Sequence, residues 1–533
     1  FGLPILDGTD VSERYIRLSP REHILLRPDT YIGSVEPVEK STWLLREDGL
    51  ALESRVAVYS PGFLKIFDEI LVNAMDQQFA VVGRKQARTT EIAVDVDKGS
   101  GIITVRNDGA GIPVEKHKEY QDWVPTFIFG ELLTGSNFDD HAGPRFVGGR
   151  NGVGAKATNV FSEWFEIEVV DQLSARRFVQ RWSNNMRSIA EPEVSEAPDA
   201  TTGLVQVRFL PDFARFGMTG IDDSTFELLR SRVIDAAACT QQGVGVKFNG
   251  EEVGVRTFTD YARLVMGVDG DTNLDVAKVQ DDTGTVRLEV AVGISENSGF
   301  QAVGFVNGIR CHEGTHIEHI VKQLTAETIS KLGKSKKDAP NIQPRFVREH
   351  LILVVKVLVE SPSFASQSKE QLETPVSKYG FAATLPSSFL KKVVKSGLAK
   401  IVQAYATFKD NAGSERKLER KMLGALPPKL EDAVHAGVEG EKCTLILTEG
   451  DSAKAMALGA LEGCPECRQN FGIFPLKGKI MNVRDAKPRT LAASSGVQEL
   501  MQIIGLKLKQ EYDSVAAPSL RYQEIMVFAD QDP

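Results

Sequence analysis

Residues 145–161 read Arg-Phe-Val-Gly-Gly-Arg-Asn-Gly-Val-Gly-Ala-Lys-Ala-Thr-Asn-Val-Phe, a run rich in glycine that ends in an apolar, helix-like segment. Glycine lets the backbone approach a ligand closely and adopt positive φ. Successive exposed amides at a helix N-terminus attract anions, and Lys156 adds a positive charge. The stretch therefore predicts a phosphate-binding loop, with a glycine-rich surface turn as the alternative. It is not a Walker A loop, because Gly-Ala-Lys-Ala lacks the Gly-Lys-Ser/Thr ending.

The composition is that of a globular protein with several domains. At roughly 150 residues per domain, 533 residues correspond to three or four domains. The net charge of −9 means that any surface for nucleic acid must be local. Two basic clusters are candidates, although such runs are usually solvated faces: Lys331, Lys334, Lys336 and Lys337, and Arg416, Lys417, Arg420 and Lys421.

The five cysteines are sparse and odd in number, which favours a reducing compartment without a disulfide framework. Cys464-Pro-Glu-Cys467 is a single CxxC without a second pair, so a surface loop is favoured over a zinc or redox site. No apolar run is long enough to span a membrane, and no signal peptide is visible. Because the chain begins with Phe1, we expect it to start inside a longer protein.

Residues 63–82 have the apolar periodicity of an amphipathic helix. Glu69 and Asn73 lie four residues apart and therefore one turn apart on the same face. Residues 91–106 alternate as strands, and Asn107-Asp-Gly-Ala-Gly-Ile-Pro113 follows. The carboxylate of Asp108 is either structural, since Asp-Gly is a common turn pair, or presented to a ligand donor beside glycines that leave room for a flat ring.

Two further α/β units are expected. The second has strands at 286–294, 302–307 and 350–359, a helix at 316–332, the polar loop Gln367-Ser-Lys369 and a charged helical segment at 387–423. The third begins near residue 441 with a buried strand before Glu449, and ends with a strand before Asp530-Gln-Asp532. Carboxylates at the ends of strands in an open sheet favour a hard cation such as Mg²⁺. The alternative is a helix cap at Glu449 and a turn at Asp530.

In this order the motifs resemble one family. Three segments are similar to the ATPase motifs of the GHKL superfamily: Lys65-Ile-Phe-Asp-Glu-Ile-Leu-Val-Asn-Ala74, Asn107-Asp-Gly-Ala-Gly-Ile-Pro113 and Gly149-Arg-Asn-Gly-Val-Gly-Ala-Lys156. Three more resemble a TOPRIM domain: Thr448-Glu-Gly-Asp-Ser-Ala-Lys454, Pro475-Leu-Lys-Gly-Lys-Ile-Met-Asn-Val483 and Asp530-Gln-Asp532. The set, which covers nearly the whole chain, resembles the type IIA DNA topoisomerases, and Lys454 favours their eukaryotic branch.

The resemblance implies a fold of three α/β parts with defined boundaries. They are a GHKL (Bergerat) ATPase sandwich at 1–253, a ribosomal-protein-like transducer with long helices at 254–423, and the N-terminal part of a Rossmann-like TOPRIM domain at 441–533. A linker at 424–440 joins the last two. It also implies ATP and Mg²⁺ as cofactors, double-stranded DNA as partner, an ATP-dependent homodimeric gate, no membrane and a nuclear location; a viral or organellar member remains an alternative.

The resemblance also assigns roles to residues of the ATPase. Glu69 is the general base, Asn73 holds Mg²⁺, and Asp108 with Asn107 faces the nucleotide's base and sugar. Lys369 reaches the γ-phosphate from the neighbouring domain, in a loop with Gln367 and with Ser368 where threonine is usual. The remaining nucleotide contacts are Gly135, Ser136 and Asn137, and the loop Gly149, Arg150, Asn151, Gly152, Val153, Gly154, Ala155 and Lys156.

For DNA, the resemblance implies phosphate contacts by Lys334, Lys336 and Lys337 and a cleavage metal held by Glu449, Asp530 and Asp532. The nucleophilic tyrosine of the family lies further downstream than Pro533. Arg521-Tyr522 imitates the family's Arg-Tyr pair in the wrong place and is interpreted as structural. The chain is therefore expected to hydrolyse ATP without cleaving DNA. A clamp or chaperone of the same superfamily is the alternative function, disfavoured by Glu449 and Asp530-Gln-Asp532.

One zinc-protease pattern is interpreted as a decoy. His312-Glu-Gly-Thr-His316 satisfies HExxH, which needs a regular helix to present both histidines. Gly314 in its middle and Asn307-Gly308 just before it weaken that helix. A connection from a strand to a helix is expected instead.

Overall fold

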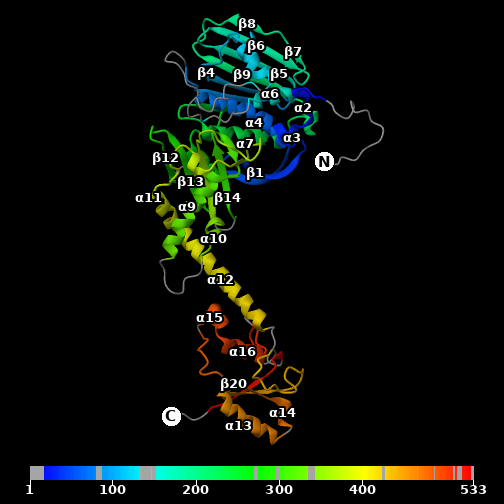
Figure 1. Ribbon diagram of the computed structural model, residues 1–533, viewed down its shortest axis with the longest axis vertical. Coiled ribbons are helices and arrows are strands. Elements are labelled where there is room, and N and C mark those ends of the chain that lie inside the picture. The colour runs from blue at the N-terminus through cyan, green and yellow to red at the C-terminus, as the bar shows by residue number, and fades with distance from the viewer. Residues whose placement is uncertain are drawn as a thin grey trace, which may run out of the picture. The chain divides into compact units, whose positions relative to one another are not determined.

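The computed structural model describes residues 17–79, 87–132, 134, 146, 152–268, 274–295, 299–333, 342–422, 426–464, 466–484, 486–507, 510–512 and 519–529. It forms two compact units (Figure 1). The first consists of Phe1–Thr328 and Val347–Leu398, and the second of Ile329–Phe346 and Ala399–Pro533. Each unit is described by itself.

The first unit contains a large sheet with the strand order β11-β10-β3-β4-β9-β5-β6-β7, in which β8 also pairs with β6. Along β9, buried and partly exposed residues alternate without a break, as expected for a strand with one face on a core. The strands are β3 (Glu91–Val96), β4 (Ile103–Gly109), β5 (Ser162–Asp171), β6 (Arg176–Ser183), β7 (Ser188–Ile189), β8 (Glu193–Glu196), β9 (Gly203–Pro211), β10 (Gly245–Phe248) and β11 (Glu251–Glu252).

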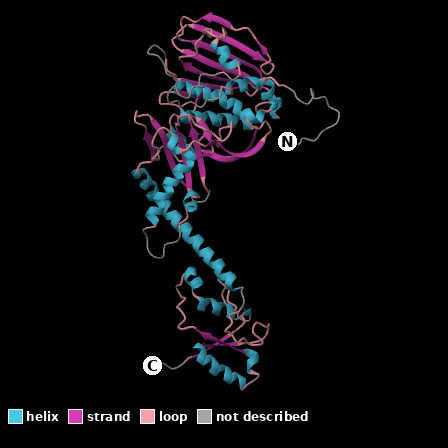
Figure 2. Ribbon diagram, viewed as in Figure 1, coloured by secondary structure: helices cyan, strands magenta, loops and turns pink. Residues whose placement is uncertain are grey.

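Helices gather on one side of this sheet (Figure 2). The central one, α4 (Pro61–Asp76), begins where the Ser60 side chain accepts a hydrogen bond from the amide of Phe63, a favourable N-cap. Its apolar residues are buried against α6 (Gly154–Val160), α7 (Asp223–Cys239) and β4. The shorter elements of this part are α2 (Pro20–Leu26), α3 (Pro28–Tyr31), the hairpin β1 (Val38–Leu45) and β2 (Leu52–Tyr59), the 3₁₀ turns Gln77–Phe79 and Phe213–Phe216, α5 (Val124–Gly130) and α8 (Phe258–Met266).

A second sheet completes the first unit, with the order β12-β13-β17-β14-β15. β14 and β17 run parallel, and α9 (Thr315–Leu332) lies in the connection between them, as parallel pairs require a crossover. Its strands are β12 (Val276–Gln280), β13 (Val286–Ile294), β14 (Gln301–Val306), β15 (Ile309–Cys311) and β17 (Leu351–Val357). Beside it are the short pair β16 (Glu313–Gly314) and β18 (Gln371–Leu372), a 3₁₀ turn Val376–Lys378, α11 (Ser387–Val393) and a π-helical turn Val394–Leu398.

The second unit has a parallel sheet with the order β20-β19-β21. α13 follows β19 directly and packs against β19 and β20. Buried residues of β19 and β20, such as Leu445 and Phe474, form its core. Its elements are α12 (Ala399–Met422), β19 (Thr444–Glu449), α13 (Gly450–Glu462), α14 (Cys467–Asn470), β20 (Phe471–Leu476), α15 (Pro488–Ala493), α16 (Ser495–Ile504) and β21 (Glu524–Phe528). The last residues of α9 and the first residues of α10 (Pro344–Arg348) also belong to this unit.

The predicted elements are largely confirmed, with three differences. The helix expected to reach residue 82 ends at Asp76 and continues as a 3₁₀ turn. Residues 184–202, whose polar and Glu/Pro-rich sequence predicts a connection, contain the short strands β7 and β8. The hairpin of β1 and β2 was not predicted, and it exposes Val56 and Val58, whose apolar side chains would normally indicate a buried face.

The sequence predicted no disulfide framework and a surface loop at Cys464-Pro-Glu-Cys467, and the structure has one disulfide within that loop. Cys464 and Cys467 form a disulfide, with Cα atoms 5.4 Å apart, a separation that a disulfide bridges without moving the backbone. Cys239, Cys311 and Cys443 are free and buried. Within the described ranges, no helix is long and apolar enough to cross a bilayer.

Candidate functional site

Glu69 lies in the middle of α4 with only 6% of its surface exposed. The Nζ atom of Lys65, one turn earlier, is 2.6 Å from its Oε1 atom. Burial by itself would raise the pKa of Glu69, but the positive charges of Lys65 and Lys369 outweigh it and hold this pKa at about 2. Glu69 is therefore an ionised carboxylate at neutral pH.

Lys65 was not among the predicted site residues, although a signal was present. A lysine four residues before a glutamate forms a favourable helical pair, and this lysine stands inside an apolar helix. Burial lowers the pKa of Lys65, but Glu69 and then Asp68 more than reverse this, so that its pKa is raised. Both members of the buried pair, Lys65 and Glu69, are thus charged.

Lys369 reaches the same carboxylate from the loop before β18, as its Nζ atom lies 3.6 Å from Glu69 Oε1. Its φ of +60° is left-handed, which is uncommon for a residue other than glycine and clusters at functional sites. The turn is closed by its amide, which donates to the carbonyl of Ser366 at 3.1 Å. The structure therefore brings this loop to the helix that carries Glu69. Ser368 lies nearby, with its hydroxyl 2.6 Å from that of Ser366.

The glycine-rich loop meets Glu69 at Gly154, the first residue of α6. A Cβ atom on Gly154 would lie 1.9 Å from Glu69 Oε2, so no other residue fits without displacing the carboxylate. Gly152 has a positive φ of 62°, which glycine adopts at little cost. Of the other predicted nucleotide contacts, Gly135, Ser136, Asn137, Gly149, Arg150 and Asn151 lie outside the described residues.

Lys156 is buried, with 3% of its surface exposed. Its Nζ atom donates to the carbonyl of Gly152 at 2.7 Å and to that of Thr134. Burial lowers its pKa to about 8, against a smaller opposing influence of Glu131. In this structure the ammonium group is therefore hydrogen-bonded to neutral backbone carbonyls, and a negatively charged phosphate would compete with them for it.

Asn107 and Asp108 point to opposite faces of β4. Asn107 is buried together with Ile103 and Val105, on the face that packs in the core with α4. The Asp108 carboxylate instead accepts hydrogen bonds from the amides of Thr90 and Glu91 at 2.7 and 2.8 Å. The prediction that Asp108 presents its carboxylate to a ligand is thus not supported. Alternation from Ile103 and Val105 would have indicated Asn107 as the inward residue.

Asn73 follows Glu69 by one turn of α4 and is partly exposed. An amide oxygen there suits Mg²⁺, which prefers oxygen ligands and retains several waters and phosphate oxygens. Among the described residues, no group of three or more His, Cys, Asp or Glu side chains could hold a metal ion.

In the second unit, Glu449 ends β19 and is exposed. The predicted partners Asp530 and Asp532 lie outside the described residues, as do Lys334, Lys336 and Lys337. Tyr522 is 1% exposed, and its hydroxyl donates to Asp432 and accepts from the amide of Ala433 at 2.9 Å. The prediction that Tyr522 is structural is confirmed.

The HExxH pattern is confirmed as a connection from a strand to a helix. Glu313 lies in β16, and α9 begins at Thr315, so the two histidines do not share a helix. Burial lowers the pKa of His312 to about 4 and that of His316 to about 3. Neither is placed as a zinc ligand.

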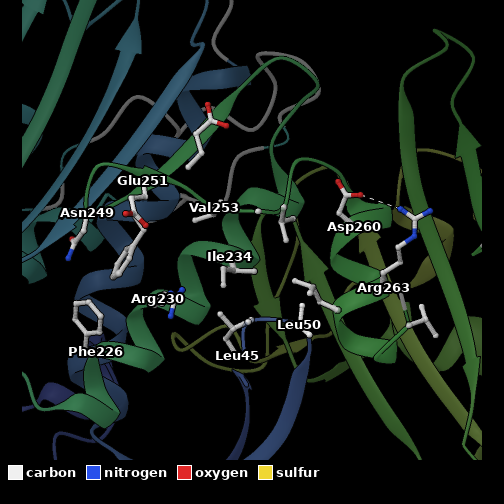
Figure 3. Close-up of a pocket in the computed structure, with 17 residues that line it drawn as sticks. Leu45, Leu50, Phe226, Arg230, Ile234, Asn249, Glu251, Val253, Asp260 and Arg263 are labelled. Atoms are coloured by element: carbon white, nitrogen blue, oxygen red, sulfur yellow. Dashed lines mark hydrogen bonds and ion pairs between the residues drawn. The ribbon is translucent and has the colours of Figure 1, made fainter. Parts of the chain in front are cut away.

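A pocket of about 680 Å³ lies elsewhere in the first unit. It is bordered by α7, α8, the β10–β11 hairpin and the turn between β1 and β2. Its lining combines apolar side chains such as Leu45, Phe226 and Ile234 with polar ones such as Arg230 and Asp260 (Figure 3). Its described lining includes none of the predicted nucleotide contacts.

Two family models match the chain. Residues 59–188 match the histidine kinase-, DNA gyrase B- and HSP90-like ATPases, and residues 257–422 match DNA gyrase B. The first match contains α4 and the glycine-rich loop, and the second contains the second sheet and Lys369. The expected GHKL sandwich and transducer are therefore confirmed.

Curated relatives and solved structures agree with this assignment. The chain is 39% identical to DNA topoisomerase 2 of Arabidopsis thaliana, over 98% of this chain and 35% of the relative. It is also 39% identical to DNA topoisomerase 2 of Drosophila melanogaster, over 98% and 36%. The chain thus spans about a third of the length of these relatives.

This chain covers two solved structures almost completely. The ATPase region of Saccharomyces cerevisiae topoisomerase II is 34% identical with a TM-score of 0.66, over 74% of this chain and 99% of that one. The ATPase and transducer domains of DNA topoisomerase II from Balamuthia mandrillaris are 36% identical with a TM-score of 0.69, over 75% and 100%.

Proposed function

The chain belongs to the DNA topoisomerase II family, and we propose that it is the ATP-hydrolysing part of a type IIA enzyme that passes one DNA duplex through another. The observation that carries the proposal is the convergence on one buried carboxylate. Glu69 meets Lys65 from its own helix, Lys369 from the second sheet's loop and Gly154 from the glycine-rich loop.

Glu69 acts in this proposal as the general base. Its pKa of about 2 keeps it ionised, so it can accept a hydrogen bond from the attacking water and orient it. Lys65 holds the carboxylate in place through the 2.6 Å ion pair. Phosphoryl transfer depends mainly on positioning and charge neutralisation, which this arrangement provides.

Lys369 contacts the γ-phosphate in this proposal. Its ammonium group is already within the site, 3.6 Å from Glu69, and a phosphate oxygen would compete for it with the carboxylate. Asn107 faces the base, the glycine-rich loop through Lys156 wraps the triphosphate, and Gln367 and Ser368 support the lysine loop. Asn73 would hold Mg²⁺, which neutralises phosphate charge when bound.

The remaining roles concern the whole enzyme. We propose an ATPase domain at 1–253, a transducer at 254–423, a linker at 424–440 and the start of a TOPRIM domain at 441–533. The parallel sheet of the second unit supports the last assignment, because β21 lies beside β19 and Phe528 pairs with Thr448, the residue before Glu449. Carboxylates following these strands, Glu449, Asp530 and Asp532, would bind the cleavage metal.

DNA and a second copy of the chain are the proposed partners. Lys334, Lys336 and Lys337 would contact phosphates, which makes binding salt-dependent rather than sequence-specific. ATP would close a dimeric gate around the DNA, and the proposed location is the nucleus.

The first test is ATP hydrolysis by the chain and by Glu69→Gln, with and without supercoiled DNA. Loss of a positioned base lowers kcat by roughly 10²–10⁴-fold, and DNA should stimulate the parent. Glu462→Gln, an exposed glutamate at the end of α13, is the matched control and should hydrolyse ATP like the parent. Equal rates for the parent and Glu69→Gln would overturn the assignment of the base.

A further inference from the structure

A second buried ion pair stands directly beside the proposed base. The Nε atom of Arg232 on α7 donates to Oδ1 of Asp68 on α4 at 2.5 Å. Their side chains are only 5% and 12% exposed. Asp68 precedes Glu69 in the same helical turn, so whatever fixes Asp68 also fixes the backbone that carries Glu69.

Arg232 binds the second sheet with its other end. Its Nη2 atom donates to the carbonyl of Gly308 at 2.9 Å. Gly308 and Asn307 form the turn between β14 and β15, with φ of +78° and +49°. One guanidinium group therefore bridges the base-bearing helix and this turn, which its planar fork of donors allows and a lysine ammonium does not reproduce.

The turn is itself held firmly at both sides. The amide of Val359 donates to the Asn307 side chain at 2.8 Å, and that side chain donates to the carbonyl of Val359 at 2.9 Å. On the other side the turn touches α4, because a Cβ atom on Gly308 would lie 2.8 Å from Cε of Met75. The turn is thus hydrogen-bonded to the segment that follows β17 of the second sheet and also contacts α4 closely.

Strand β15, which follows this turn, also contacts the loop that carries Lys369. The thiol of Cys311, at the end of β15, donates to the carbonyl of Lys369 at 3.2 Å. Lys369 is one link between the second sheet and Glu69, and the bridge through Arg232 and Asp68 is a separate one that involves neither the lysine side chain nor a nucleotide.

We propose that Arg232 is a positioning residue that fixes Glu69, through Asp68, to the β14–β15 turn, so that movement of the second sheet changes the position of the base. The proposal rests on the proposed function. The Arg232 proposal extends the proposed function, because it makes ATP hydrolysis depend on the second sheet through contacts other than those of Lys369.

The structure offers a matched control. Arg310 on β15 donates from Nη1 to Oδ2 of Asp235 on α7 at 3.0 Å, and the hydroxyl of Tyr261 donates to Oδ1 at 2.6 Å. The side chains of Arg310 and Asp235 are 11% and 1% exposed. This pair also joins α7 to the second sheet and is similarly buried, but neither member adjoins Glu69 in the chain.

The test compares Arg232→Lys with Arg310→Lys in thermal unfolding and steady-state ATP hydrolysis. Both should lower the unfolding midpoint by a few degrees, because each weakens a buried pair. Arg232→Lys should lower kcat by about 100-fold, the effect of a shift of roughly 1 Å in a reacting group, with KM changed less than about threefold. Arg310→Lys should keep kcat within about threefold of the parent. Equal losses of kcat, or none in Arg232→Lys, would overturn the proposal.

A second measurement does not need hydrolysis. Asp68→Asn keeps the shape of α4 but weakens the bridge, so the backbone amides of residues 305–311 should exchange hydrogen at least about tenfold faster than in the parent. Unchanged exchange would contradict the bridge. A parent that neither binds nor hydrolyses ATP would refute the proposed function instead, while the exchange result would still decide whether the bridge couples α4 to the second sheet.

Discussion

The two helices that meet at the proposed site each bury a lysine, and the two lysines behave in opposite ways. Lys65 on α4 is paired with Glu69 and has a raised pKa, although burial opposes it. Lys156 on α6 meets backbone carbonyls, and burial lowers its pKa to about 8. Burial alone disfavours the charged form, so the neighbouring carboxylate decides the difference. Ion pairs therefore fix the carboxylate of Glu69, whereas the ammonium group of Lys156 near the glycine-rich loop carries a charge that a ligand can stabilise.

The largest effect is expected where the two regions touch. Gly154→Ala places a methyl group 1.9 Å from the present position of Glu69 Oε2, so the carboxylate must move. Overpacking of this kind costs about 1–3 kcal/mol of stability, and displacement of the base by roughly 1 Å should lower kcat about 100-fold. Steady-state hydrolysis and thermal unfolding measure the two effects.

Gly459→Ala is the control for this change. Gly459 lies within α13, and a Cβ atom there would meet nothing within 4 Å. Alanine is favoured over glycine in a helix interior by up to about 1 kcal/mol, so this variant should be at least as stable as the parent with unchanged hydrolysis. If both alanine variants hydrolyse ATP equally well, the close contact between Gly154 and Glu69 is not functional.

An intermediate effect is expected from Lys65→Met, which removes the charge but keeps the bulk of the side chain. In this variant only the positive charge of Lys369 still opposes the effect of burial on the pKa of Glu69. This pKa should therefore increase from about 2 by roughly 1–3 units. A carboxylate base is lost as pH falls through its pKa, and the acidic limb of kcat/KM should therefore move to higher pH. The control Lys391→Met, at an exposed lysine, should leave the acidic limb of the pH profile unchanged. An unchanged limb in Lys65→Met as well would contradict the role of Lys65.

The smallest effect concerns Lys156. With a pKa of about 8, its ammonium group loses its proton as pH rises from 7 to 9, and binding of a non-hydrolysable ATP analogue should weaken by up to about tenfold. Lys156→Arg should remove this dependence, because arginine stays charged. Calorimetric titration at several pH values measures it, and parallel pH profiles for parent and variant would refute it.

The same pKa has a consequence for stability, with a definite sign. An unfolded lysine titrates near 10.4, so between about pH 8 and 10 the unfolded chain binds more protons at this position than the folded one. The contribution of Lys156 to stability therefore increases with pH over that range.

Much of the site could be predicted because its motifs are local. The helical period of α4 places Glu69 and Asn73 one turn apart before any tertiary contact forms, and the positive φ of Gly152 agrees with the glycine content of its loop. The face of β4 could also have been predicted, since Ile103 and Val105 alternate with exposed residues and place Asn107 inward. Asn107 and Asp108 were named together in the prediction from sequence, and the alternation of buried residues along β4 is what distinguishes them.

Other features had no local signal. Nothing near Arg232 in the sequence indicates Asp68 or Gly308, and the hairpin of β1 and β2 exposes valines that would normally indicate a buried face. The disulfide between Cys464 and Cys467 did have a local signal in the CxxC spacing, but the choice between a loop and a disulfide depended on the folded backbone, which brings the two Cα atoms to 5.4 Å.

The sequence by itself determined which residues carry charge, which segments form helices and strands, and the order of motifs that identifies the family, because these follow from local geometry and residue chemistry. Only the tertiary structure decided which charges meet. Lys369 and Arg232 reach α4 from distant parts of the chain, and burial there makes an ion pair far stronger than it would be in water. The ionised state of Glu69 and its attachment to the second sheet are therefore properties of the packed molecule.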